Sequence, residues 1–334
     1  MNSTLSLYNL TFAANGGLGN GHYVAAGDTI TVLNNFEVQS GMYNGTSGAI
    51  DLYGNLTYNG SGARAGYAAG TLRFMGTAAQ TYAWAATNPG PKIVVDKTSG
   101  SLTAASANAH FSSLTVTNGL FTAPAGNLTI GGGGYAEPGS QTVMTLSSPA
   151  AFSHNNGNLI FWAYDDWSAT YQYTFRFNGS LAINNAEFIG FGNSGNVIFG
   201  GDTLVVAGSA THTSGILTGN INYQGNVAFN SAVKGPAVST FNGTGAQSIS
   251  GSFPTAGHWT VNKASGTMTL ANAFNLNGAG QNLTISAGTV NISGNNLTVA
   301  NNISNSGTLQ RGSNPTCGTI SQGGGYSGAA AICP

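Results

Sequence analysis

Residues 288–299 read Gly288-Thr-Val-Asn-Ile-Ser-Gly-Asn-Asn-Leu-Thr-Val299, and this stretch shows the pattern that decides the fold. Its short runs alternate apolar and polar residues, and Gly and Asn lie between them. A period of two places one face of a β-strand in a core and the other in water. Gly and Asn supply the positive-φ positions that sharp corners need. We therefore expect short β-strands joined by tight corners.

The same pattern recurs along the chain, for example at Thr29–Val32, Ile50–Tyr53, Asn127–Ile130 and Asn282–Ile285. The repeated unit is roughly 20 to 25 residues long, which is too short to bury its own apolar face, so neighbouring units must stack. This predicts an all-β fold of the parallel β-solenoid (β-helix) type. Tandem β-sandwiches are the alternative, because short strands with frequent turns also build sandwiches.

A longer repeat is superimposed on the short one. Phe74-Met-Gly-Thr-Ala-Ala-Gln-Thr-Tyr82 aligns with Phe241-Asn-Gly-Thr-Gly-Ala-Gln-Ser-Ile249, a shift of 167 residues from position 74 to position 241. Val95-Asp-Lys-Thr-Ser-Gly100 likewise aligns with Val261-Asn-Lys-Ala-Ser-Gly266. We expect two tandem copies of about 167 residues in one continuous solenoid. Copy 1 covers 1–167, copy 2 covers 168–312, and a disulfide-closed segment covers 313–334.

Charged residues make up only 5% of the 334 residues, and the net charge is −1. An ordinary domain has roughly a quarter. Stacked coils account for the difference, because equivalent side chains lie about 4.8 Å apart and like charges would repel along the stack. Nucleic acid is excluded as a partner, since phosphate binding needs clustered Lys and Arg. No apolar run approaches the ~18 residues of a membrane span.

Three strings carry a family resemblance: Phe111-Ser-Ser-Leu-Thr-Val116, Trp259-Thr-Val-Asn-Lys-Ala-Ser-Gly266, and Gly288–Gly294 followed by Asn296–Val299. They resemble the Asn/Gly/Thr-rich repeats of large bacterial surface proteins of the adhesin and autotransporter-passenger type. The resemblance covers nearly the whole chain. It implies a right-handed parallel β-helix and an extracellular or cell-surface location.

The most aromatic stretch is Phe161–Phe175, and it contains the adjacent pair Asp165-Asp166. One interpretation is a sugar-binding platform, or the acid pair of a polysaccharide lyase or glycoside hydrolase. Adjacent residues on a strand point to opposite faces, which disfavours catalysis. A packed junction loop or a subunit contact is the favoured interpretation. The candidate ligand-binding residues are Trp162, Tyr164, Asp165, Asp166, Trp167, Tyr171 and Tyr173.

Cys317 and Cys333 are the only cysteines in the sequence. Their placement predicts one disulfide and an oxidising, extracytoplasmic environment. No cofactor or metal site is expected, because the histidines show no ligand spacing. Asp28 and Asp202 are interpreted as turn caps. The equivalent lysines Lys97 and Lys263 are interpreted as solvated corners, with a catalytic or isopeptide role as the alternative. Asn-x-Ser/Thr sequons such as Asn55 and Asn302 are interpreted as mostly structural, with some able to carry glycans.

The chain opens in repeat-like sequence, Leu5-Ser-Leu-Tyr-Asn-Leu-Thr-Phe12, without a polar cap in front of it. Uncapped solenoid ends are templates for further strands. We therefore expect a non-enzymatic structural subunit of an extracellular filament or surface adhesin shaft, which assembles head to tail with copies of itself. A carbohydrate-binding adhesin that contacts glycans or a host or neighbouring cell surface is the first alternative. A β-helical polysaccharide lyase or glycoside hydrolase is the second.

Overall fold

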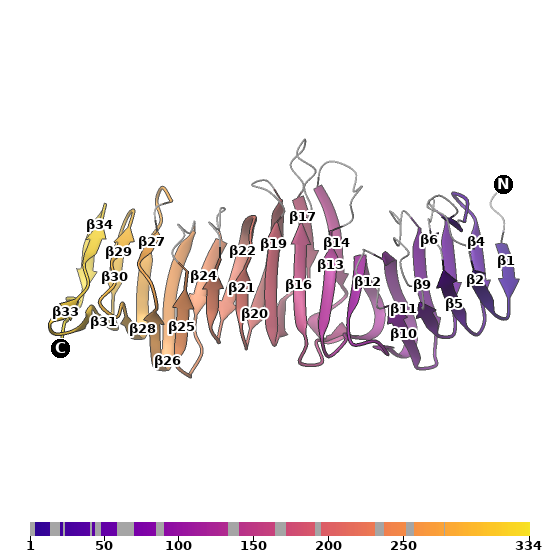
Figure 1. The fold of residues 1–334 in the computed structure, drawn as a ribbon, viewed down its shortest axis with the longest axis horizontal. Coiled ribbons are helices and arrows are strands. Elements are labelled where there is room, and N and C mark those ends of the chain that lie inside the picture. Colours follow the sequence, from indigo (N-terminus) through magenta and orange to yellow (C-terminus); the bar gives the residue numbers. More distant parts are fainter. Residues whose placement is uncertain are drawn as a thin grey trace. The chain divides into compact units, whose positions relative to one another are not determined.

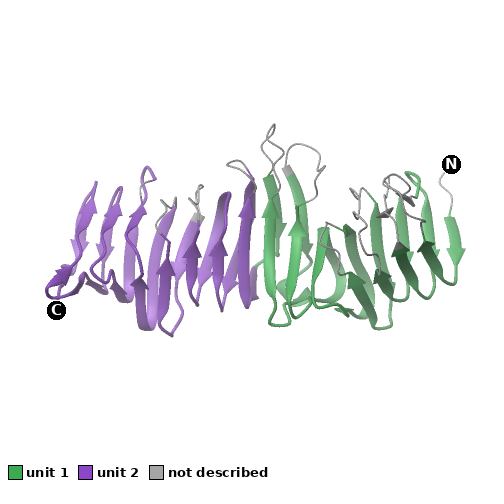
Figure 2. Cartoon of the chain, in the orientation of Figure 1, with its two compact units in different colours: residues 1–179 green, residues 180–334 purple. Residues whose placement is uncertain are grey.

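The computed structural model describes residues 4–13, 21–22, 24–40, 42–43, 48–58, 70–84, 90–132, 140–163, 172–190, 195–230, 237–251, 257–276 and 278–334. These residues form a parallel β-solenoid of about 12 turns (Figure 1). The helical structure among them is one 3-10 turn, η1. The parallel pairing confirms the predicted solenoid and shows that tandem sandwiches are wrong, because sandwiches pair their strands antiparallel. The chain divides into two compact units, Met1–Gly179 and Ser180–Pro334 (Figure 2).

Unit 1 consists of β-strands, most of them two to seven residues long, with η1 near its end. Its elements are β1 (Thr4–Leu7), β2 (Leu10–Ala13), β3 (Gly21–His22), β4 (Thr29–Val32), β5 (Phe36–Ser40), β6 (Met42–Tyr43), β7 (Ala49–Leu52), β8 (Leu56–Tyr58), β9 (Thr71–Gly76), β10 (Gln80–Trp84), β11 (Gly90–Ala104), β12 (Ala109–Thr122), β13 (Asn127–Gly131), β14 (Ser140–Leu146), η1 (Pro149–Ala151), β15 (Phe152–Ser153), β16 (Asn158–Ala163) and β17 (Gln172–Arg176).

Unit 2 also consists of β-strands, and it contains one small antiparallel pair, β32 with β33, before the last two strands. Its elements are β18 (Ser180–Ile183), β19 (Asn185–Gly190), β20 (Asn196–Val206), β21 (Ala210–His212), β22 (Ile216–Tyr223), β23 (Val227–Phe229), β24 (Ala237–Phe241), β25 (Gln247–Ser250), β26 (His258–Leu270), β27 (Phe274–Leu276), β28 (Leu283–Asn291), β29 (Leu297–Val299), β30 (Ile303–Asn305), β31 (Thr308–Gln310), β32 (Gly312–Ser313), β33 (Thr316–Cys317), β34 (Ile320–Gln322) and β35 (Tyr326–Gly328).

The register in unit 1 stacks equivalent residues of successive coils. Thr29 pairs with Ala49 and Ala49 pairs with Thr71, so these coils take 20 and 22 residues. Every second side chain points inward and forms a row through the core. One such row is Leu5, Ile30, Ile50, Leu72, Ile93 and Leu114.

The core of unit 2 contains aromatic rows as well as aliphatic ones. His212 lies between Phe188 and Phe229, with ring centroids 4.6 and 4.7 Å away and the rings nearly parallel. Tyr223 and Phe241 stack in the neighbouring row at 5.4 Å. Because equivalent positions of successive coils stack at the strand spacing, their rings lie close enough to interact directly. Such ring pairs add stability beyond what burial of their apolar surface contributes.

Close approach of neighbouring coils explains some of the many glycines. At Gly54 an added Cβ would lie 1.3 Å from the carbonyl oxygen of Asn34 in the preceding coil. No side chain can be accommodated at that distance, so only Gly fits this corner. The coils are thus held close enough for corner side chains to bond from one coil to the next.

Candidate functional site

The aromatic stretch that the sequence proposes as a ligand platform begins in β16 and ends in β17. Trp162 packs against His110, with ring centroids 5.1 Å apart. Tyr173 is 1% exposed and lies in the core of unit 1. The remaining members lie outside the described residues, so the platform stays a prediction: Tyr164, Asp165, Asp166, Trp167 and Tyr171.

Lys263 is a buried corner residue of unit 2, with only 1% of its surface exposed. Its Nζ donates to the carbonyl oxygens of Gly243 and Gly245, at 2.5 and 2.9 Å, and to Gln247 Oε1 at 2.7 Å. Gln247 Nε2 in turn donates to the carbonyl oxygens of Tyr223 and Gly225. This Lys–Gln clamp therefore ties three successive coils together.

Unit 1 has a matching clamp. Lys97 is 1% exposed and its Nζ donates to Gln80 Oε1 at 2.5 Å. Gln80 Nε2 donates to the carbonyl oxygens of Leu52 and Gly54. The sequence-based interpretation of both lysines as solvated corners is wrong, because carbonyl groups of the neighbouring coils enclose them. Burial lowers the pKa of both ammonium groups from the ordinary lysine value.

The clamp has the character of a structural link. Around Lys263 each of the three ammonium protons has an acceptor, so the buried charge is compensated by dipoles. The repeated sequence strings contain a feature from which the clamp could have been predicted. Gln80 and Gln247 occupy the same position in the two aligned repeat strings, six residues after Phe74 and Phe241 respectively.

Asparagine ladders line another set of corners. Asn9 Oδ1 accepts from the backbone N–H of Asn35 at 3.1 Å, Asn35 Oδ1 from that of Asn55 at 3.4 Å, and Asn55 Oδ1 from that of Thr81 at 2.8 Å. Each side chain thus satisfies a corner N–H of the next coil. Sequon residue Asn302 does the same for Gly325. The sequon asparagines Asn9, Asn55 and Asn302 therefore have a structural role, as the sequence suggests.

One buried titratable pair occurs in the core of unit 2. His212 Nε2 lies 2.8 Å from Tyr223 Oη. Burial lowers the pKa of His212 to about 3 and raises the pKa of Tyr223 above its ordinary value. The imidazole is therefore neutral at physiological pH, which suits its position between two phenyl rings.

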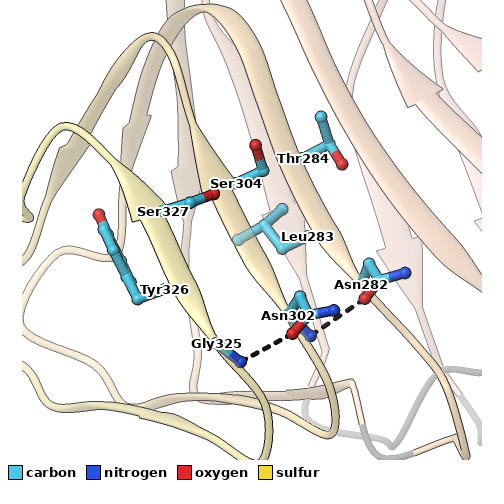
Figure 3. A pocket seen from close by; sticks show the side chains of 8 residues that line it. All are labelled: Asn282, Leu283, Thr284, Asn302, Ser304, Gly325, Tyr326 and Ser327. Carbon is cyan, nitrogen blue, oxygen red and sulfur yellow. Dashed lines mark hydrogen bonds between the residues drawn. The ribbon is translucent and has the colours of Figure 1, made fainter.

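A cavity of about 380 Å³ lies on the outer surface of the last coils of unit 2 (Figure 3). Strands β28, β30 and β35 form it, and their register places Thr284, Ser304 and Ser327 side by side. The lining side chains are uncharged, and most are polar. The lining residues are Asn282, Leu283, Thr284, Asn302, Ser304, Gly325, Tyr326 and Ser327.

The groups around this cavity are held in place by bonds between coils. Asn282 Oδ1 accepts from the backbone N–H of Asn302 at 3.0 Å, and Asn302 Oδ1 accepts from that of Gly325 at 2.7 Å. Figure 3 shows these two contacts along one edge of the cavity. The sequence did not reveal this cavity, because its residues are up to 45 positions apart and the register between coils is not readable from the pattern.

The C-terminal segment contains the predicted disulfide. Cys317 and Cys333 are bonded, with their Cα atoms 6.0 Å apart, which confirms the pairing. Within the described part of the chain, no group of three or more His, Cys, Asp or Glu residues is placed to hold a metal ion. The described residues also include no helix long and apolar enough to cross a bilayer.

Comparison with protein-family models, with curated proteins and with solved structures finds no match to this chain. The evidence for the fold is therefore the parallel pairing and the stacked core of the chain itself.

Proposed function

We propose that this protein is a structural subunit of an extracellular filament or of a surface adhesin shaft, and that it assembles head to tail. The observation that carries the proposal is an open apolar edge on the first coil of unit 1. Leu5 is the first member of an inward-facing core row, yet it is 53% exposed. Two positions further along the same row, Ile50 is fully buried.

The backbone at this edge is open as well. Among the described strands, β1 pairs only with β4 and β2 only with β5. Their outer N–H and C=O groups form a template to which another strand can add. A strand that adds there would also cover Leu5, so hydrogen bonding and apolar burial favour the same contact.

The last coil of unit 2 offers a different edge. Among the described strands, β35 pairs only with β30 and β34 only with β29, and Ile332 is 45% exposed. Joining two different edges is a heterologous contact, and such a contact repeats without closing unless a rotation brings it into a ring. The partner in this proposal is thus a second copy of the chain.

The stacked corners suit a load-bearing shaft. Among the described residues of each unit, neighbouring coils are joined by ladder hydrogen bonds, at several corners by Asn side chains, and at one place in each unit by a Lys–Gln clamp. The disulfide is consistent with an oxidising, extracytoplasmic location. The proposal assigns the chain no enzymatic activity.

A matched pair of variants tests the edge. Leu5→Asp places a charge on the open core row, whereas Leu33→Asp changes an equally exposed leucine, also 53%, at a corner of the next coil. We expect light scattering to show that wild type and Leu33→Asp form particles whose mass grows with concentration, and that Leu5→Asp stays monomeric. A wild type that is monomeric at every concentration would overturn the proposal, and so would equal growth in both variants.

A further inference from the structure

The cavity formed by β28, β30 and β35 has the features of a small-molecule site. Its volume of about 380 Å³ lies within the ~300–1,000 Å³ typical of ligand pockets. It is built on three adjacent strands rather than on long loops. Sites on regular elements hold their groups more precisely than sites on loops do.

Three hydroxyl groups form a row along the cavity. Thr284, Ser304 and Ser327 occupy one register position on successive coils, at the strand spacing of about 4.8 Å. Within the described residues none of these hydroxyls has a hydrogen-bond partner in the protein, and each offers one donor and two acceptors. Figure 3 shows them side by side.

The edge of the cavity supplies an oriented donor. Asn302 Oδ1 is occupied by the N–H of Gly325 at 2.7 Å, so the side-chain amide is held in one orientation and its Nδ2 remains available. Tyr326 shares its register position with the buried residues Leu283 and Ile303, so its ring lies on the face of the strands opposite to the hydroxyl row. There its Oη donates to the carbonyl oxygen of Ala329 at 2.7 Å and accepts from Asn305 Nδ2 at 3.3 Å, which holds β35 in place.

The chemistry of the lining selects a class of ligand. Hydroxyl and amide groups both donate and accept, and no lining residue carries a formal charge. A ligand that matches them is neutral and carries hydroxyls at regular intervals. We propose that this cavity is a binding site for a neutral saccharide.

This site is separate from the aromatic stretch Phe161–Phe175 and does not depend on the filament proposal. Variants distinguish binding at the cavity from binding at the aromatic stretch. Ser304→Val removes the middle hydroxyl of the row and keeps a residue that favours strands. Thr260→Val is the matched control, because Thr260 is the register partner of Thr284 one coil away and does not line the cavity.

The test is to titrate the full chain with four neutral trisaccharides: maltotriose, cellotriose, chitotriose and laminaritriose. Saturation-transfer NMR and calorimetry measure the binding. Trigalacturonate serves as the charged comparator and glycerol as the simple polyol. We expect at least one neutral trisaccharide to bind more tightly than either comparator. Ser304→Val should weaken that binding by about tenfold, as loss of one hydrogen bond in a bound state predicts, and Thr260→Val should leave it unchanged.

Several results would overturn the inference. They are the absence of binding by all four neutral trisaccharides, binding of glycerol or trigalacturonate that is at least as tight, and binding that Ser304→Val leaves intact. Binding that survives Ser304→Val and is lost in Trp162→Ala would place the saccharide on the aromatic stretch instead. Ser327→Val is a second variant at the exposed end of the row, and it should weaken binding in the same direction.

Discussion

At the scale of single residues, buried polar side chains form hydrogen bonds that join neighbouring coils. The Lys97–Gln80 clamp connects carbonyl groups that face the interior of a corner. An unsatisfied buried polar group costs about 1–3 kcal/mol, so each member of such a clamp is expected to matter for stability.

The variant Lys97→Met tests this expectation. It keeps the length of the side chain and leaves Gln80 Oε1 without its donor, so we expect a loss of about 1–3 kcal/mol and a lower urea midpoint. Lys92→Met is the control, because Lys92 is exposed in the same strand and surface changes of this kind stay within about 0.5 kcal/mol. Equal midpoints for the two variants would show that the clamp contributes nothing.

His212 predicts a pH dependence with a definite sign. Its folded-state pKa is about 3, whereas an unfolded chain protonates histidine near its ordinary pKa of about 6.5. Between these values the unfolded chain binds the proton and the folded chain does not, so stability falls as the pH drops through this window.

His212→Phe removes this titration and keeps a ring between Phe188 and Phe229. We expect the urea midpoint of wild type to fall more between pH 7 and pH 4 than that of the variant. We compare the change in midpoint with pH and not the midpoints themselves, because the variant also removes the contact between Tyr223 Oη and His212 Nε2. The same pH-dependent change in both proteins would contradict the assignment.

At the scale of elements, the sequence predicts the strands well and their lateral neighbours poorly. The alternation in Thr29–Val32 and Asn282–Ile285 identifies strands, because a period of two is a property of one chain segment. Which residue of the next coil lies beside Thr284 depends on corner lengths, and these vary from coil to coil. The cavity at Thr284, Ser304 and Ser327 is therefore visible only in the structure.

The buried lysines show the same limit. A lysine next to Ser-Gly predicts a solvated corner when only local sequence is considered. Lys263 is buried instead because Gly243, Gly245 and Gln247, on the preceding coil, present three acceptors to it. The repeated Gln was the available clue, since it recurs in one pair of aligned strings and the Lys recurs in the other pair, 16 or 17 residues later.

The disulfide gives a prediction for the terminal coil of unit 2. Cys317 and Cys333 are separated by 16 residues, and closing a loop of about this length contributes roughly 3 kcal/mol by the chain-entropy estimate. We expect reduction to make residues 312–334 susceptible to limited proteolysis while the preceding coils stay resistant.

The double variant Cys317→Ser/Cys333→Ser provides the control. It should show the same cleavage without reductant and no further response when reductant is added. A terminal segment that resists protease equally with and without the disulfide would mean that the coil stacking alone holds it.

At the scale of the whole molecule, the low charge is a consequence of architecture. Only 17 residues of 334 are Asp, Glu, Lys or Arg, and neutral Asn, Ser and Thr occupy many of the outward and corner positions. In unit 1, Arg73 and Asp51 occupy paired register positions on neighbouring coils and form an ion pair. Stacking tolerates this pair because the two charges are opposite. Because the surface carries so few charges, electrostatic repulsion between two copies of the chain is weak.

The central claim is end-to-end assembly through the open edge at β1, and electron microscopy of the purified chain over a concentration series tests it most directly. We predict unbranched filaments of uniform width whose length increases with concentration, and their absence in Leu5→Asp at the same concentrations. Single particles of one size at every concentration of the wild-type chain would contradict the claim.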